Sequence, residues 1–275
     1  MNRKYSISHL TALQLSPPEL IYLADRVGFD YVSLRTICMG LGNEPDYTLS
    51  KNPYLFKMTR NALASTNVTL LDIELARIYD GRDVRSYERS LEIAAELGAK
   101  HVITSVWTDD KSYAVEQYGL LCGISQQYGL TVDLEYVPIS NLTTLAAVVD
   151  VLHQVNQPNQ GILIDIHHFH RAQDRVEELA KLPTEWFNFI HLCDASQEIP
   201  DDLEEIRRVL REERSYIGEG GIDVHSIVDA LPTIPFSIEL PHLKRLQELG
   251  PDQFAKNCLE SAKRYFSGGS QKMIK

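Results

Sequence analysis

The sequence has little of what marks secreted, membrane-spanning or nucleic-acid-binding proteins. Its four cysteines, Cys38, Cys122, Cys193 and Cys258, lie far apart and form no CxxC motif, which favours unpaired thiols in a reducing compartment. No apolar run approaches the ~18 residues that a membrane helix needs. The first ten residues, MNRKYSISHL, lack the apolar core of a signal peptide. We therefore expect a cytoplasmic protein that has no membrane partner.

Positive charge is also scarce. The chain has 27 Lys and Arg residues against 38 Asp and Glu residues, a net charge of -11. Nucleic-acid phosphates are bound by basic surfaces, so this balance argues against a nucleic-acid partner. We expect a protein that acts on a small molecule, and the sequence leaves open whether the chain forms a homo-oligomer.

Short apolar runs alternate with longer amphipathic segments along the whole chain. One such segment, SPPELIYLADRVG, begins with prolines and ends with glycine, as helices often do. Strands that alternate with helices indicate parallel pairing. Eight candidate strands divide the 275 residues into units of about 34, which is typical of a (β/α)8 TIM barrel. The candidate strands are 5–8, 30–35, 68–75, 100–106, 130–137, 161–166, 186–192 and 235–240.

We therefore predict an α/β protein with a single TIM-barrel domain over residues 1–275, in which the tail after about residue 266 is frayed. A doubly wound sheet is the alternative. Two longer connections, 36–51 and 193–234, follow strands at the active face of such a barrel. We expect them to form a lid or a collar around the substrate.

Acidic and imidazole side chains fall at the ends of four successive strands. Because side chains alternate between the two faces of a strand, Glu135, Asp165, His191 and Glu239 all point into the barrel near its mouth. Like charges so close together cannot all stay ionised without a cation. Three carboxylates and one imidazole suit Mn²⁺, Co²⁺, Mg²⁺ or Zn²⁺. The alternative is that each carboxylate forms its own buried ion pair with Arg or Lys.

The same alternation assigns faces in the third strand. It places Asp72 and Glu74 inward together with Leu70, and it places Leu71, Ile73 and Leu75 on the opposite, helix-facing side.

Several side chains near the mouth are candidates for contact with a substrate. His168, three residues after Asp165, leans back over the mouth, whereas we expect His167 and His170 to be solvated. Arg35 ends the second strand on the inward face and either binds the substrate or pairs with Glu74. The remaining candidates, which either line the mouth or only pack there, are Trp107, Arg245, His242 and His9.

Five short motifs give the chain a resemblance to a known family. They are LEYVP, DIHH, HLCD, GEGGID and SIELP, in this order. Together they resemble the xylose isomerase-like TIM-barrel superfamily, the sugar phosphate isomerase/epimerase group, over nearly the whole chain. The resemblance implies one divalent ion, with Mn²⁺ as the first candidate, held by Glu135, Asp165, His191 and Glu239. It also implies that His168 contacts substrate or a metal-bound water and that Glu219 lies in the loop before the last strand.

The chain departs from two branches of that superfamily. The AP endonucleases have further metal-binding histidines and an Asp-x-His after the seventh strand, which HLCDASQEIPDD lacks, so a three-metal nuclease site is not expected. Some ketose epimerases have an Arg soon after the seventh-strand His. Here the segment from Ser196 to Asp202 has polar and acidic residues in place of an arginine. No phosphate clamp is evident either.

These observations predict a metal-dependent isomerase or epimerase of a sugar or related polyhydroxy carbonyl compound. Glu135 and Glu239 would move protons on opposite sides of a carbon next to a metal-bound carbonyl. Isomerases and dehydratases both begin by removing a proton next to the carbonyl. A dehydratase of the inosose or 3-dehydroshikimate type is therefore the alternative. A non-catalytic barrel that binds a ligand is the third hypothesis.

Overall fold

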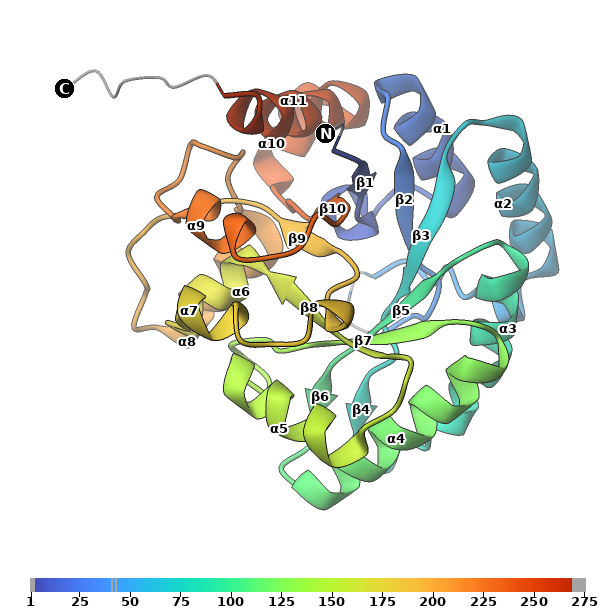
Figure 1. Cartoon of the computed structure of the whole chain (residues 1–275). Helices are drawn as coiled ribbons and strands as arrows, with labels where there is room; N and C mark the ends of the chain where they lie inside the picture. The colour runs from blue at the N-terminus through green and yellow to red at the C-terminus, as the bar shows by residue number, and fades with distance from the viewer. Residues whose placement is uncertain (1–2, 41, 43, 269–275) are drawn as a thin grey trace.

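The computed structural model describes residues 3–40, 42 and 44–268. Eight parallel strands close into a barrel with the order β1-β10-β9-β8-β7-β5-β3-β2, and the helices lie outside the ring (Figure 1). The predicted (β/α)8 TIM barrel is confirmed. The barrel strands are β1 (Tyr5–Ile7), β2 (Tyr31–Arg35), β3 (Thr69–Glu74), β5 (His101–Thr104), β7 (Thr131–Glu135), β8 (Gln160–Asp165), β9 (Ile190–Leu192) and β10 (Phe236–Ile238).

The first helix shows how the sequence sets element boundaries. Ser16 and Glu19 form a capping box at its start, and Gly28 ends it with a left-handed φ of 92°. No helix in the described part of the chain is long and apolar enough to cross a membrane. The α-helices are α1 (Pro17–Val27), α2 (Pro53–Ser65), α3 (Glu88–Glu96), α4 (Lys111–Gln127), α5 (Leu145–Val155), α6 (Ile166–Arg171), α7 (Val176–Leu179), α8 (Leu203–Glu212), α9 (Val224–Asp229), α10 (Leu243–Leu249) and α11 (Pro251–Phe266).

Most predicted strands are shorter than the apolar pattern suggested, and two of them change in character as well. The run at 100–106 divides into β5 and a separate strand β6 (Val106–Trp107), which pairs with β4 (Ile78–Tyr79) in a small sheet beside α4. The run at 186–192 becomes strand only at Ile190, because Thr184–Trp186 forms a 3-10 turn. Most of the predicted frayed tail, residues 269–275, lies outside the described residues.

The predicted facing of Leu70, Leu71 and Leu75 is wrong. The pairing of β2 with β3 shifts register between Val32 and Ser33, opposite Leu70 and Asp72, so that one residue of β3 bulges. Leu70 and Ile73 pack in the main core, whereas Leu71 packs in a separate cluster inside the barrel. The other buried members of that inner cluster are Leu75, Ile103, Leu163 and Phe189.

Polar groups share the barrel interior with this apolar layer. Asp133 accepts hydrogen bonds from Asn188 at 2.7 Å and from Thr131 at 3.0 Å. A Cβ atom at Gly161 would lie 2.4 Å from an Asp133 carboxylate oxygen, so the neighbouring strand must carry glycine there. The polar layer therefore constrains the sequence as tightly as an apolar core would.

Asp72 is a buried carboxyl group in the same interior. Its Oδ1 accepts a hydrogen bond from Ser33 at 2.5 Å, and its Oδ2 has no hydrogen-bond partner. Burial raises the pKa of Asp72 to about 7. A carboxyl group with a raised pKa contributes most stability below its unfolded pKa, and that contribution is lost as the pH rises through about 7.

We predict that Asp72→Asn makes the fold more stable than the wild type at pH 8. The gain should be a few kcal/mol, because the variant has no charge to bury, and it should shrink at pH 5. Urea unfolding of both proteins at the two pH values measures this difference. A stability difference that is the same at pH 5 and pH 8 would contradict the assignment.

Candidate metal centre and active site

Four buried side chains meet at the carboxyl ends of neighbouring strands. Glu135 and Asp165 are the last residues of β7 and β8, His191 lies in β9, and Glu239 directly follows β10. One ligand atom from each lies within 4.8 Å of all the others. The four side chains that the sequence placed together are together in the structure.

His191 lies at the centre of this group. Its Nδ1 is 3.3 Å from Glu135 Oε1, 3.5 Å from Glu239 Oε1 and 3.9 Å from Asp165 Oδ2. Neither ring nitrogen of His191, nor Glu135 Oε1, makes a hydrogen bond of good geometry, although all three atoms are buried. Buried polar atoms that face one another without partners are what a divalent cation would satisfy, so these residues fit a metal.

The pKa values of the group show how strongly its members interact. Burial raises the pKa of Glu135 to about 7 even though His191 opposes the rise. Burial alone would lower the pKa of His191, but Glu239 and Glu135 outweigh it and raise that pKa well above its usual value. Without metal, the group therefore retains a proton. A cation must displace that proton, so metal binding should tighten as the pH rises.

Arg214 is a member of the site that the sequence did not reveal. Its guanidinium is fully buried and lies 2.7 Å from Asp165 Oδ2 and 3.1 Å from Glu239 Oε2. Nε also donates to the carbonyl of Leu210 at 3.0 Å. The predicted alternative, a buried ion pair for each carboxylate, is thus present for two of the three. The connection 193–234 contains several arginines, and only the three-dimensional fold shows which one turns inward.

His168 lies beside the four ligands, as predicted. Its Nε2 is 4.0 Å from Glu135 Oε1, and its Nδ1 is 3.8 Å from Asp165 Oδ1. The backbone N–H of His168 also donates to Asp165 at 3.0 Å, which caps the start of α6. Burial lowers the pKa of His168 to about 4, so the ring is neutral at pH 7.

The expectation that His167 and His170 are solvated is wrong for His167. His167 is buried, and its Nδ1 is 3.3 Å from His168 Nδ1. Helix α6 begins directly after β8, so the chain turns back over the barrel and does not enter solvent. His170 is partly exposed and contacts Arg171 at 2.7 Å.

Arg35 and Glu74 are paired with each other at the mouth. Arg35 Nη2 is 2.9 Å from Glu74 Oε2, and Arg35 Nη1 is 3.8 Å from Glu44 Oε1. All three side chains are buried. The structure thus forms the predicted salt bridge, and the connection 36–51 contributes a second carboxylate, from Glu44, that the sequence analysis missed.

The histidine near the end of β1 has a structural role. His9 accepts a hydrogen bond from the backbone N–H of Arg35 at 2.9 Å, so its other ring nitrogen donates to the carbonyl of Leu15 at 2.7 Å. Burial lowers the pKa of His9 to about 4, in agreement with a neutral ring. Both nitrogens are occupied, which leaves His9 no polar atom for a substrate.

Trp107 and Arg245 have partners outside the group of four candidate ligands. The indole N–H of Trp107 donates to Ser105 at 2.8 Å. Arg245 pairs with Glu219 at 2.7 Å and lies over the ring of Tyr216 at 4.4 Å. The Glu219–Arg245 pair links the turn before β10 to α10. His242 Nδ1 accepts a hydrogen bond from the backbone N–H of Arg245 at 3.4 Å and so caps the start of α10.

The Asp of the HLCD motif holds the loops around the site. Asp194 accepts backbone hydrogen bonds from Gly218 at 3.0 Å, Gly220 at 3.0 Å and Ile222 at 3.2 Å. A Cβ atom at Gly220 would lie 2.2 Å from an Asp194 oxygen. The GEGGID segment therefore needs glycine so that its backbone can approach this carboxylate.

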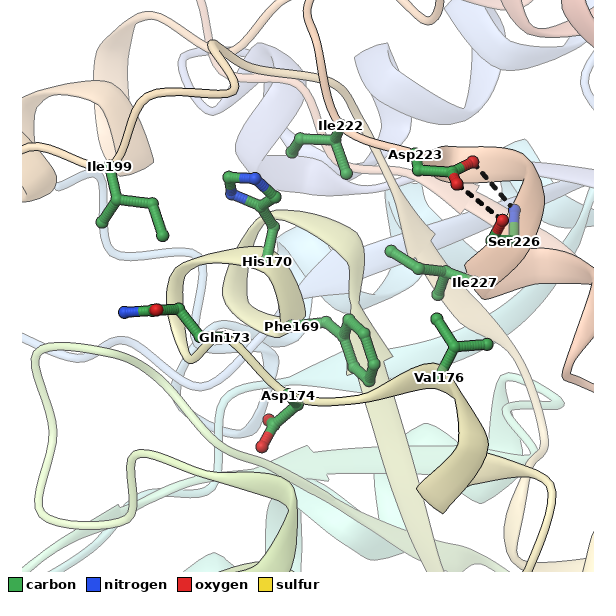
Figure 2. Close-up of a pocket in the computed structure, with 10 residues that line it drawn as sticks. All are labelled: Phe169, His170, Gln173, Asp174, Val176, Ile199, Ile222, Asp223, Ser226 and Ile227. Atoms are coloured by element: carbon green, nitrogen blue, oxygen red, sulfur yellow. Dashed lines mark hydrogen bonds between the residues drawn. The ribbon is translucent and has the colours of Figure 1, made fainter.

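A separate hollow of about 270 Å³ lies among α6, α7 and α9 (Figure 2). Phe169, Val176 and Ile227 make its wall apolar, and the carboxylate of Asp223 is occupied by hydrogen bonds to Ser226. None of the four candidate ligands lines this hollow. The chemistry is therefore expected at the barrel mouth and not here.

We predict that Asp165→Asn weakens metal binding by at least about 100-fold, because it removes one charged ligand. The Asn oxygen can still cap α6, so the fold should persist. Metal analysis after dialysis, together with circular dichroism, measures both. The control is Asp133→Asn, which changes a buried carboxylate on the same face of β7 as Glu135. This variant should retain the metal. Equal metal occupancy in Asp165→Asn and the wild type would remove Asp165 from the ligand set.

Comparison with known proteins bears on the family and the fold. The family model described as "Xylose isomerase-like TIM barrel" matches residues 21–258. An inosose isomerase of Bacillus subtilis (strain 168) is 24% identical over 289 residues, covering 96% of this chain and 99% of that protein.

Solved structures show the same fold at lower identity. The crystal structure of the IOLI protein with a bound zinc atom has a TM-score of 0.79 and 21% identity, covering 96% of this chain and 99% of that one. The probable 3-DHS dehydratase AsbF from Bacillus anthracis has a TM-score of 0.71 and 17% identity, covering 94% of this chain and 98% of that one.

Proposed function

This chain belongs to the xylose isomerase-like TIM barrel family, and on that basis we propose that it is a metal-dependent isomerase or epimerase of a sugar or cyclitol. The observation that carries the proposal is the set of four buried ligand atoms within 4.8 Å at the barrel mouth. The similarity to an inosose isomerase supports a polyhydroxy carbonyl substrate. We expect one Mn²⁺ per chain, and the zinc in the IOLI protein makes Zn²⁺ the second candidate.

The residues of the mouth divide into three tasks. Glu135, Asp165, His191 and Glu239 would hold the ion, which when bound stabilises negative charge on a carbonyl oxygen. Glu135 and Glu239 come from β7 and β10, on either side of β8 and β9, and would each exchange a proton with one face of the substrate carbon. His168 would donate a hydrogen bond to a substrate oxygen, since its ring is neutral and one nitrogen carries hydrogen.

We also propose substrate contacts for the outer residues of the mouth. Arg35 and Glu74 are fixed by their ion pair and can present the remaining guanidinium and carboxylate atoms to hydroxyl groups. Trp107 offers an apolar ring of the kind that stacks on sugars, and Arg245 borders the mouth beyond Glu239.

We predict that His168→Ala retains the metal but loses about 10²-fold in turnover, because a hydrogen bond to the reacting substrate is removed. Elemental analysis and steady-state kinetics separate the two effects. His225→Ala, which changes an exposed histidine of α9 that stacks on Tyr265, serves as the control and should remain active. If His168→Ala also lost the ion, His168 would be a ligand.

Separate replacement of the two glutamates tests the proton transfers. Glu135→Gln and Glu239→Gln should each lower turnover by about 10²-fold or more, because each lacks one base. In an epimerase, one variant should still exchange substrate hydrogen in D₂O, and the other should do so only with the opposite epimer. Metal occupancy is measured first, since Gln also weakens the site. Near wild-type turnover in both metal-loaded variants would refute the two-carboxylate mechanism.

A dehydratase is the second candidate, favoured by the structural likeness to the probable 3-DHS dehydratase. Proton removal next to the carbonyl is common to both reactions, and loss of hydroxide distinguishes the dehydratase. Incubation of ketoses, inososes and 3-dehydroshikimate with the Mn²⁺-loaded protein, followed by product mass, separates them. An isomer has the mass of its substrate, whereas a dehydrated product is lighter by one water.

A further inference from the structure

One buried arginine near the mouth has no carboxylate partner. Three arginines are buried in the described part of the chain: Arg35, Arg171 and Arg214. Arg35 pairs with Glu74, and Arg214 pairs with Asp165 and Glu239. No carboxylate lies within ion-pair distance of Arg171 among the described residues, and burial lowers the pKa of its guanidinium.

The contacts of Arg171 are all with uncharged groups. Its side chain is only 6% exposed. Nη1 donates to the carbonyl of Ser196 at 3.0 Å and contacts His170 Nδ1 at 2.7 Å, whereas Nε has no partner. Burying a positive charge without a counter-ion costs free energy. The hydrogen bond to Ser196 alone therefore does not explain why an arginine is buried at this position.

Arg171 faces a cavity of about 640 Å³, a size that suits a small-molecule ligand. The cavity is built on the active face, from segments that directly follow the ligand-bearing strands. Arg171 is three residues beyond His168, Ser196 is five beyond His191, and His242 is three beyond Glu239.

None of the four acidic residues that line this cavity lies within ion-pair distance of Arg171. On the α8 side, Glu205 and Glu213 are both paired with Arg208. The other two acidic residues, Glu198 and Asp201, are solvent-exposed at the rim. Arg171 therefore presents to the cavity a buried guanidinium that pairs with no carboxylate of the described residues.

We propose that this cavity holds an oxyanionic group of the substrate, a phosphate monoester or a carboxylate, with Arg171 as its anchor. The inference rests on the proposed function, because it places the anion of a substrate whose carbonyl end lies at the metal. A guanidinium matches both oxyanions, since its parallel N–H groups donate to two oxygens at once. The proposal names the substrate class as an acidic sugar derivative or a sugar phosphate.

Calorimetric titration of the metal-loaded protein with inorganic phosphate and with acetate tests the proposal. We expect one of them to bind, phosphate if the substrate is a phosphate monoester and acetate if it is a carboxylate. Arg171→Gln should weaken that binding at least about tenfold. Arg171→Lys should weaken it less, because lysine keeps the positive charge but lacks the paired N–H donors of the guanidinium. Arg207→Gln, which alters an exposed arginine of α8 that pairs with Glu204 and does not line the cavity, should change it less than about threefold.

Two results would overturn the proposal. One is that neither anion binds to the wild type. The other is that the metal-loaded Arg171→Gln protein binds the anion as the wild type does, which would mean that the anion sits on the metal or that Arg171 only supports the fold. If Arg171→Gln does not fold, the wild-type and Arg171→Lys titrations still decide. Because binding is measured without turnover, failure to isomerise any substrate counts against the proposed function and not against this site.

Discussion

The crowding of three carboxylates at one end of the barrel is the constraint on which the rest of the structure depends. Parallel neighbouring strands end at the same edge, so Glu135, Asp165 and Glu239 cannot avoid one another. Ionised carboxylates at this distance repel strongly in a buried setting. The fold meets this constraint with Arg214, which is carried in by the long connection after β9 and is fully buried between two of the acids.

That connection is itself fixed by backbone contacts that leave little freedom around Arg214. Asp194 pairs with Ser215 in a short antiparallel bridge, and Glu213 pairs with His242 in another. The two bridges flank Arg214 in sequence, and the Asp194 carboxylate holds the glycine-rich turn that follows. Loss of these contacts would free the arginine and leave the acids without their fixed cation. Asp194 of the HLCD motif and the GEGGID segment therefore support the site by fixing the backbone around it.

The sequence predicted the barrel and the four convergent residues because both follow from local rules. Alternation along a strand and the shared edge of parallel strands were sufficient for Glu135 and His191. The same rule failed at Leu71, where a bulge depends on pairing between two strands. It gave no indication of Arg214, which reaches the acids from 49 residues beyond Asp165 in the chain. Burial of His167 likewise depends on how α6 folds back, which no residue spacing reveals.

Counting charges connects the metal centre to the cavity beside it. Three carboxylates and the one guanidinium of Arg214 leave two negative charges, which a single divalent cation balances when His191 is neutral. Arg35 already has two acidic neighbours, Glu44 and Glu74. Once the ion is bound, the buried guanidinium that still has no carboxylate at ion-pair distance, among the described residues, is that of Arg171. A neutral substrate would leave that charge without a counter-ion, whereas an anionic one would neutralise it, so the mouth should discriminate in favour of substrates that carry an oxyanion.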